Sequence, residues 1–175
     1  VHPRRVLARR TRSSEAAFKY VIYGSVASGV MLFGISLVFG MAGTVDIAVL
    51  ADRLAMAPPM GVTMALVLMF AGFGYKIASV PFHMWSPDVY EGSPLPVTAF
   101  LSVASKAAGF GLVIRFFRDG MGTAAVMATV DWPLFLAVVS AVTMTVGNLA
   151  AFGQTNVKRL LAYSSIAHGG YLLMG

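Results

Sequence analysis

The fold is decided by the stretch Gly72-Phe73-Gly74-Tyr75-Lys76-Ile77-Ala78-Ser79-Val80-Pro81-Phe82-His83-Met84-Trp85-Ser86-Pro87-Asp88-Val89-Tyr90-Glu91-Gly92. A lysine stands at the end of a long apolar run, and a proline follows five residues later. A helix of a soluble protein would turn Lys76 toward water, yet the residues before it are apolar on every side. Pro81 lacks a backbone donor and clashes with the preceding turn, so it interrupts the helix. We therefore predict an interrupted membrane helix that carries an ionisable group.

The composition of the whole chain is that of a membrane protein. Of its 175 residues, 58% are hydrophobic and 11% are charged, and the mean hydropathy is +0.78. Soluble domains carry about 25% charged residues, so a soluble fold is excluded. The formal charge of +6 is concentrated in the first twelve residues, which contain Arg4, Arg5, Arg9, Arg10 and Arg12. The high pI therefore reflects one basic flank, and we expect the lipid bilayer, not a nucleic acid, as partner.

The reactive residue types are few and scattered. The sequence has no cysteine, which excludes disulfides and cysteine-ligated iron–sulfur clusters. Its three histidines, His2, His83 and His168, are too far apart in sequence to indicate a zinc site. The sequence begins with Val1 and stops at Gly175 inside an apolar run, so we expect a piece of a longer protein.

Apolar runs predict an all-α, polytopic membrane helix bundle with about five spans, at residues 18–39, 60–85, 96–117, 130–152 and 160–175. A helix of about 20 residues crosses the hydrocarbon core of a bilayer. The discontinuity near Pro81 falls inside the second span. Residues 1–17 are expected to form a basic cytoplasmic loop, and residues 40–57 a loop with a short interfacial helix.

The basic residues predict the orientation. The N-terminal flank with Lys19 has six, the turn at Lys158 and Arg159 has two, and three lie on the other side, namely Arg53, Arg115 and Arg118. Because cytoplasmic loops carry an excess of lysine and arginine, we place the N-terminal flank in the cytoplasm. The segment with Asp88 and Glu91 falls on the same side, and we expect these acids to cap or salt-bridge rather than to react.

Two lysines inside predicted spans are candidates for proton transfer. Lys106 follows Pro96 by ten residues, roughly 15 Å along a helix and close to the bilayer middle. A charged amine at that depth costs several kcal/mol, so such lysines face a bundle interior or a water-filled cavity. Lys76 and Lys106 are predicted to transfer protons. The alternative is that each snorkels or pairs with a buried carboxylate and only holds helices together.

Two histidines are weaker candidates. His83 follows Pro81 by two residues, where an imidazole could relay protons between Lys76 and the aqueous side. His168 lies in the last apolar run beside two serines. A lone histidine is more often a hydrogen-bonded packing residue, so both roles stay open at both positions.

Three stretches, residues 76–94, 96–108 and 148–168, together resemble the signature of the antiporter-like membrane subunits of respiratory complex I, NADH:quinone oxidoreductase. Two motifs resemble subunit N of that enzyme more than its L and M relatives: Asp88-Val89-Tyr90-Glu91-Gly92 and Ser164-Ser165-Ile166-Ala167-His168. The resemblance covers about residues 13–175.

The resemblance implies a fourteen-helix subunit built from inverted five-helix repeats, of which this chain would hold the sixth to tenth helices. Lys76 matches the lysine of the family's broken seventh helix, and Lys106 matches that of the eighth. Both belong to the family's central line of proton-transfer groups. The family's glutamate on the fifth helix would precede Val1, and the lysine of the later broken helix would follow Gly175, so half of the path would lie outside this chain.

The implied function is proton translocation by a subunit of NADH:quinone oxidoreductase in the bacterial inner (plasma) membrane, beside the other membrane subunits of complex I. NADH, FMN, the iron–sulfur clusters and quinone would belong to the rest of the complex, so we expect no cofactor and no metal in this chain. The alternatives are an Mrp-type cation/proton antiporter, a membrane-bound hydrogenase subunit, and a purely structural membrane spacer.

Overall fold

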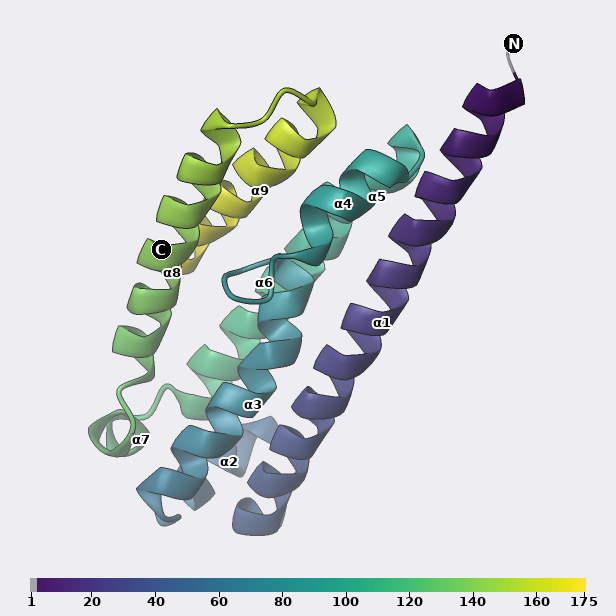
Figure 1. The fold of residues 1–175 in the computed structure, drawn as a ribbon. Coiled ribbons are helices and arrows are strands. Elements are labelled where there is room, and N and C mark those ends of the chain that lie inside the picture. Colours follow the sequence, from purple (N-terminus) through teal and green to yellow (C-terminus); the bar gives the residue numbers. More distant parts are fainter. Residues whose placement is uncertain (1–2) are drawn as a thin grey trace.

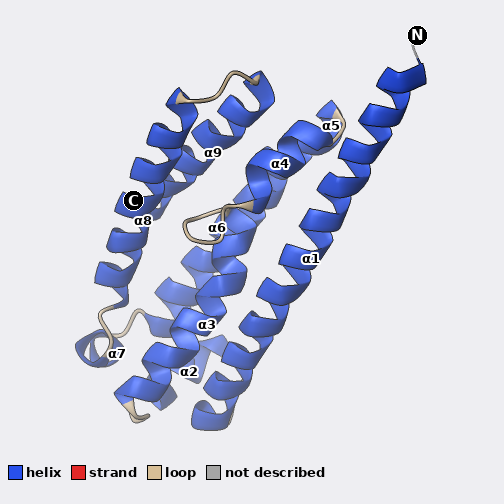
Figure 2. Ribbon diagram, in the orientation of Figure 1, coloured by secondary structure: helices blue, strands red, loops and turns tan. Residues whose placement is uncertain are grey.

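The computed structural model describes the backbone of residues 3–175 and the side chains of residues 11–175, and the described chain is built from helices (Figures 1 and 2). In chain order these are α1 (Pro3–Ala42), α2 (Ile47–Leu54), α3 (Pro59–Ile77), α4 (Trp85–Gly92), α5 (Leu95–Ser102), α6 (Ala104–Arg115), the π-helix η1 (Phe116–Gly120), α7 (Ala124–Thr129), α8 (Trp132–Phe152) and α9 (Val157–Met174). The predicted all-α class is confirmed.

Four helical stretches are long and apolar enough to cross a membrane: Thr11–Ala42, Pro59–Ile77, Leu95–Gly120 and Trp132–Phe152. The fifth predicted span is helical as α9, which carries Lys158 and Arg159 in its first turn. In Figure 1, α1 runs along one side of the bundle, α8 and α9 form the other side, and α3 to α6 lie between them. This arrangement is a polytopic membrane helix bundle.

The N-terminal basic segment is helical, which corrects the loop expected over residues 1–17. Helix α1 begins at Pro3, and proline suits the first turn of a helix. No glycine or further proline follows until Gly24, so nothing in the sequence breaks the helix at the membrane surface. Lys19 and Glu15 add an i,i+4 ion pair of 2.7 Å. The first two residues lie outside the described part of the chain.

The predicted discontinuity near Pro81 is confirmed, and it begins just before the proline. Helix α3 ends at Ile77, and Ala78 takes a left-handed conformation with φ 58° and ψ 43°. The Ser79 N–H donates to the Gly74 carbonyl at 2.8 Å, and the Ala78 N–H donates to the Tyr75 carbonyl at 3.2 Å. These two bonds form the helix-ending pattern that satisfies the last carbonyls. The chain becomes helical again at α4.

A second irregularity, which the sequence did not indicate, separates α5 from α6 at Val103. This residue has φ −114° and ψ −70°. Its N–H still donates to the Ala99 carbonyl at 3.2 Å, and its carbonyl still accepts from the Ala107 N–H at 2.9 Å. The helix is therefore distorted rather than ended, three residues before Lys106. No glycine or proline marks the place, which is why the sequence predicted an unbroken span.

Close helix contacts depend on small residues. A Cβ atom at Gly147 of α8 would lie 2.7 Å from the Ala167 nitrogen of α9, and one at Gly170 would lie 2.9 Å from the Met144 nitrogen. Small residues allow such backbone approach in membrane bundles. These contacts fix α9 against α8 and so determine where the residues of α9 meet the centre of the bundle.

Candidate functional site

Lys106 is a buried cation held by neutral oxygen atoms. Only 5% of the residue is exposed. Its Nζ donates to the Ser165 carbonyl at 2.9 Å and to Ser165 Oγ at 2.7 Å. An ammonium has three donors, so these acceptors satisfy two of them. No ion pair involves Lys106 among the residues whose side chains are described.

His168 and Lys106 line the same cavity. Both residues line a cavity of about 240 Å³ between the α5–α6 junction and α9, together with Ser165. His168 is exposed, its Nδ1 lies 2.8 Å from the Ser164 carbonyl, and its ring meets Tyr171 edge-on. The structure therefore brings two of the four predicted site residues into one cavity, although no hydrogen bond joins them in the described chain.

Lys76 faces a different cavity. It lies in the last turn of α3, where a cation is favoured by the helix dipole. The cavity, of about 540 Å³, lies among α1, α3 and α6, and its lining includes Tyr20, Ser25 and Ser28. Lys76 is exposed and has no hydrogen bond or ion pair within residues 11–175. Within this part of the chain, its ammonium is thus available to water or to another partner.

The two lysine regions meet at Gly109 of α6. A Cβ atom on this glycine would lie 3.2 Å from Lys76 Cγ and 2.9 Å from Ile77 Cγ2. Gly109 is three residues after Lys106, about one helical turn. The stem of Lys76 therefore lies against the helix that carries Lys106, approximately one turn away along it.

We expect Gly109→Ala to displace the stem of Lys76 and to lower activity, because Ile77 is fully buried and has no free space into which to move. Such overpacking costs about 1–3 kcal/mol. The measurement is proton pumping and thermal stability of the assembled complex that carries the full-length variant subunit.

The matched control for this change is Gly111→Ala, on the same helix. A Cβ atom at Gly111 would meet nothing within 4 Å. Alanine is the better helix former by about 1 kcal/mol, so this variant should be as stable as the parent or more so. If the two variants have equal proton pumping and equal thermal stability, the close contact of Gly109 with the side chains of Ile77 and Lys76 is contradicted.

His83 lies in the linker between α3 and α4 and is half-buried. Its Nδ1 is buried and has no hydrogen-bond partner among residues 11–175. No hydrogen bond connects His83 with Lys76 in the described chain, so the relay between them stays a prediction.

Aromatic side chains cover the C-terminal end of α3, and no sequence motif indicated this role for them. Trp85 Nε1 donates to the Tyr75 carbonyl at 3.0 Å, and the Tyr75 hydroxyl donates to the Tyr20 carbonyl at 2.8 Å. The rings of Tyr20, Trp85 and Tyr75 pack together, with centroids 5.1–6.0 Å apart. The Tyr75 carbonyl, which accepts from the Ala78 N–H at the helix end, therefore takes a second hydrogen bond from Trp85, on the far side of the break.

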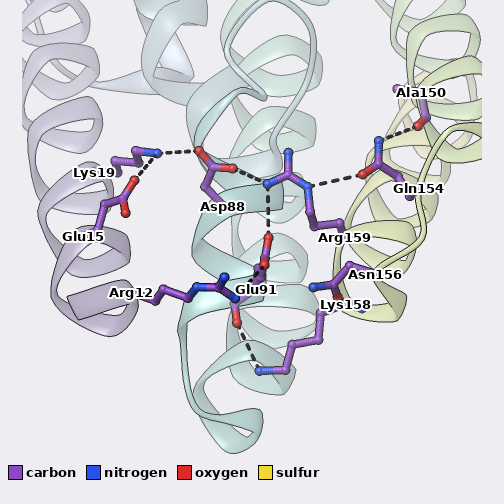
Figure 3. Close-up of polar contacts among 10 residues, drawn as sticks. All are labelled: Arg12, Glu15, Lys19, Asp88, Glu91, Ala150, Gln154, Asn156, Lys158 and Arg159. Carbon is purple, nitrogen blue, oxygen red and sulfur yellow. Dashed lines mark hydrogen bonds and ion pairs between the residues drawn. The ribbon is translucent and has the colours of Figure 1, made fainter. Parts of the chain in front are cut away.

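An ion-pair cluster around Asp88 and Glu91 of α4 holds α1, α4 and α9 together (Figure 3). Asp88 accepts from Lys19 at 2.7 Å and from Arg159 at 2.6 Å. Glu91 accepts from Arg159 at 3.2 Å and pairs with Arg12 at 3.5 Å. The prediction that both acids form salt bridges is confirmed. The sequence did not identify their partners, which lie about 70 residues away on either side.

The cluster also changes the protonation of Asp88. Partial burial alone would raise the pKa of this carboxyl, but the hydrogen bonds from Lys19 and Arg159 and their positive charges lower it below its ordinary value of 3.8. Asp88 is therefore ionised at neutral pH, and its ion pairs link α4 to α1 and α9.

Fold and site together define a class: a helical membrane protein with a broken span and, on the next span, a buried lysine that forms no ion pair with residues 11–175. The chain belongs to the NADH:quinone oxidoreductase/Mrp antiporter transmembrane family, whose model matches residues 5–175. The resemblance deduced from the three sequence stretches is thereby confirmed.

Individual relatives agree with this assignment. The chain is 54% identical over 172 residues to "NADH-quinone oxidoreductase subunit N 2" of Sorangium cellulosum, covering 94% of this chain and 34% of the relative. Respiratory complex I from Thermus thermophilus contains a chain with a TM-score of 0.77 and 40% identity, matching 93% of this chain and 34% of that one. The Mrp complex from Dietzia matches with a TM-score of 0.76 and 25% identity, over 92% and 29% of the two chains. This chain thus spans about a third of such proteins.

Proposed function

We propose that this chain is part of a proton-translocating membrane subunit of NADH:quinone oxidoreductase, and that Lys106 carries a proton during translocation. The observation that supports this most directly is the pairing of Lys106 with Ser165. A serine hydroxyl both accepts and donates hydrogen bonds, so it can hold the ammonium and, after rotation, the neutral amine. A carboxylate partner would instead fix the lysine in its charged form.

Lys76 supplies a second protonatable group on the neighbouring helix. Its stem packs against Gly109, one turn from Lys106, so the two lysines lie on neighbouring helices, although they line different cavities. In a medium of low dielectric constant, a charge on one lysine disfavours a charge on the other. Movement of a proton on or off one lysine would therefore favour the opposite change at the other, which couples the protonation of the two lysines.

The setting of this activity is part of the proposal. The chain would lie in the bacterial inner membrane and contact other membrane subunits of the complex, while NADH, FMN, iron–sulfur clusters and quinone are bound elsewhere. The similarity to complex I at 40% identity, against 25% for the Mrp complex, favours this setting over an Mrp-type antiporter. The neutral partners of Lys106 favour a relay over a structural spacer.

The test is Lys106→Arg in the full-length subunit of the assembled complex. Arginine keeps the charge and can still donate to Ser165, but it does not release its proton in proteins. We expect proton pumping to fall at least about tenfold, with normal assembly. If Lys106 only held helices together, arginine would replace it without loss of proton pumping. Pumping at the parental rate would therefore overturn the proposal.

The matched control is Lys158→Arg. Lys158 lies in the first turn of α9, and its Nζ donates to the Ser93 carbonyl at 2.8 Å. Arginine can make the same kind of bond, so this variant should pump normally. Equal losses in both variants would mean that the larger side chain, and not the held proton, is responsible.

A further inference from the structure

A polar cavity of about 670 Å³ lies at one end of the bundle, between α1, the start of α5 and the start of α9. In Figure 1 these segments gather at the end of the bundle from which the N-terminal part of α1 projects. Thr11 and Leu95 are the first residues of two candidate membrane spans, and α9 begins at Val157. The cavity therefore lies at the boundary between the bilayer and water, and its volume is in the range of ligand sites. Its lining consists of Arg12, Ser13, residues 91–95, Asn156 and Lys158.

Ser13 and Asn156 bring hydrogen-bond donors to this cavity that no other described residue uses. Asn156 Oδ1 accepts from the Lys158 N–H at 2.9 Å, and the amide NH₂ of Asn156 has no acceptor within residues 11–175. The Ser13 hydroxyl also has no hydrogen bond within that range, and a hydroxyl can donate. Lys158 differs, because its Nζ donates to the Ser93 carbonyl at 2.8 Å and to the Glu91 carbonyl at 3.5 Å. Lys158 thus closes the wall, and the free donors remain for a ligand that carries acceptors.

The charge around the cavity is positive. The Arg12 side chain is 72% exposed, and its contact with Glu91 is 3.5 Å long, whereas Arg159 holds Glu91 at 3.2 Å. The negative charge of Glu91 in the cavity wall is thus balanced by two arginines (Figure 3). Eight basic residues belong to this end of the bundle against three acidic ones, namely Arg4, Arg5, Arg9, Arg10, Arg12, Lys19, Lys158 and Arg159 against Glu15, Asp88 and Glu91. Such an excess of positive charge attracts anions.

Apolar side chains at the rim of the cavity favour a lipid over a free anion. Leu95 lines the cavity and is 70% exposed, and Val157, next to Asn156 in the chain, is 70% exposed as well. Helix α5 continues into the candidate span with Phe100, which is 63% exposed. An inorganic anion would use only the donors, whereas a phospholipid would place its phosphate among them and its acyl chains along the apolar surface of α5. Basic pockets between spans and basic clusters beside span ends are typical sites for anionic headgroups.

We propose that this cavity binds the headgroup of an anionic phospholipid, with Arg12, Ser13 and Asn156 as donors to its phosphate oxygens. An arginine can donate two parallel hydrogen bonds to a phosphate. The bound lipid would link α1 to α9 at the membrane surface, next to the ion-pair cluster. This site goes beyond the transfer of protons and does not depend on the role of Lys106.

The test is photolabelling of the assembled complex, with the full-length subunit, in phosphatidylcholine vesicles that contain a phosphatidylglycerol with a photoactivatable headgroup. We expect labelled peptides from the start of α1 and from the start of α5 or α9, located by mass spectrometry. Arg12→Gln should reduce this labelling about fivefold, because one basic residue beside anionic headgroups changes the affinity by roughly that factor. The exposed ion pair of Arg12 contributes little to stability, so this variant should assemble normally.

Two further variants serve as controls. Arg12→Lys keeps the positive charge, so it should retain most of the labelling. Arg53→Gln removes an arginine of α2 that is exposed, lies outside the lining of the cavity and forms no ion pair within residues 11–175, so its complex should be labelled like the parent. Equal labelling of the Arg12→Gln and Arg53→Gln complexes would overturn the proposed lipid site.

Three other results would each overturn the lipid site as well. Equal labelling of the same peptides by a photoactivatable phosphatidylcholine would show that the cavity does not select an anionic headgroup. Protection by excess inorganic phosphate would indicate a site for a free anion. Absence of label from these peptides in the parent complex would mean that another part of the protein fills the cavity. None of these results bears on proton pumping by Lys106→Arg, so the lipid site and the proposed function stand or fall separately.

Discussion

Replacing Lys106 with methionine is expected to lower the rate of proton pumping at least about tenfold. The complex should stay as stable as the parent or become more stable. Methionine matches the length of the buried stem and removes only the ammonium. Burying a charge has a large desolvation cost, and replacing buried charges by apolar groups of similar volume is often neutral or stabilising. Opposite effects on activity and stability are the expected result for a residue kept for proton transfer.

The measurement is pumping per NADH oxidised in vesicles, beside the thermal unfolding midpoint of the purified complex. Lys158→Met serves as control, because Lys158 lies at the start of α9 and outside the cavity of Lys106. If Lys106→Met lowers stability and leaves pumping intact, Lys106 is a structural residue and the spacer alternative is correct.

Asp88→Asn is expected to cost about 1 kcal/mol of stability with a smaller effect on the chemistry of Lys106. Asp88 accepts from cations on α1 and on α9 at 2.7 and 2.6 Å. An amide offers one oxygen and turns its NH₂ group toward the other cation, so one charge-assisted bond is lost, while Lys19 keeps its ion pair with Glu15 and Arg159 keeps its ion pair with Glu91. The measurement is thermal unfolding of the complex, with Asp52→Asn as the control, because Asp52 is exposed and forms no ion pair within residues 11–175.

The pH dependence of this effect has a definite sign. The folded-state pKa of Asp88 lies below its ordinary value of 3.8, so its contribution to stability is complete above that value and is lost as the pH falls through the lower, folded-state pKa. The stability difference between the parent and Asp88→Asn should therefore be constant across neutral pH and shrink only below about pH 3.8. If the stability difference between the parent and Asp88→Asn disappears near neutral pH, Asp88 is not held in its ionised form by Lys19 and Arg159.

The broken helix shows how far local sequence reaches. Pro81 predicted an interruption, because the loss of a donor and the steric clash act within one turn. The helix nevertheless ends at Ile77, because Ala78 turns left-handed and the carbonyls of Gly74 and Tyr75 are satisfied there. In the N-terminal segment the sequence predicts a basic loop, but charge alone does not stop a helix without a glycine or proline, and α1 begins at Pro3.

Local sequence is enough to predict that this chain is a membrane bundle, that one span is broken, and that Lys76 and Lys106 lie within spans. These features follow from hydropathy, helical rise and the chemistry of proline, which act over short stretches. The packing of the helices is needed to bring Lys106 to Ser165, 59 residues away, and to place Asp88 between Lys19 and Arg159. These contacts depend on how α9 packs against α8 and α4. The backbones of α8 and α9 approach each other at glycines, and no local sequence pattern specifies which residues of the two helices face each other.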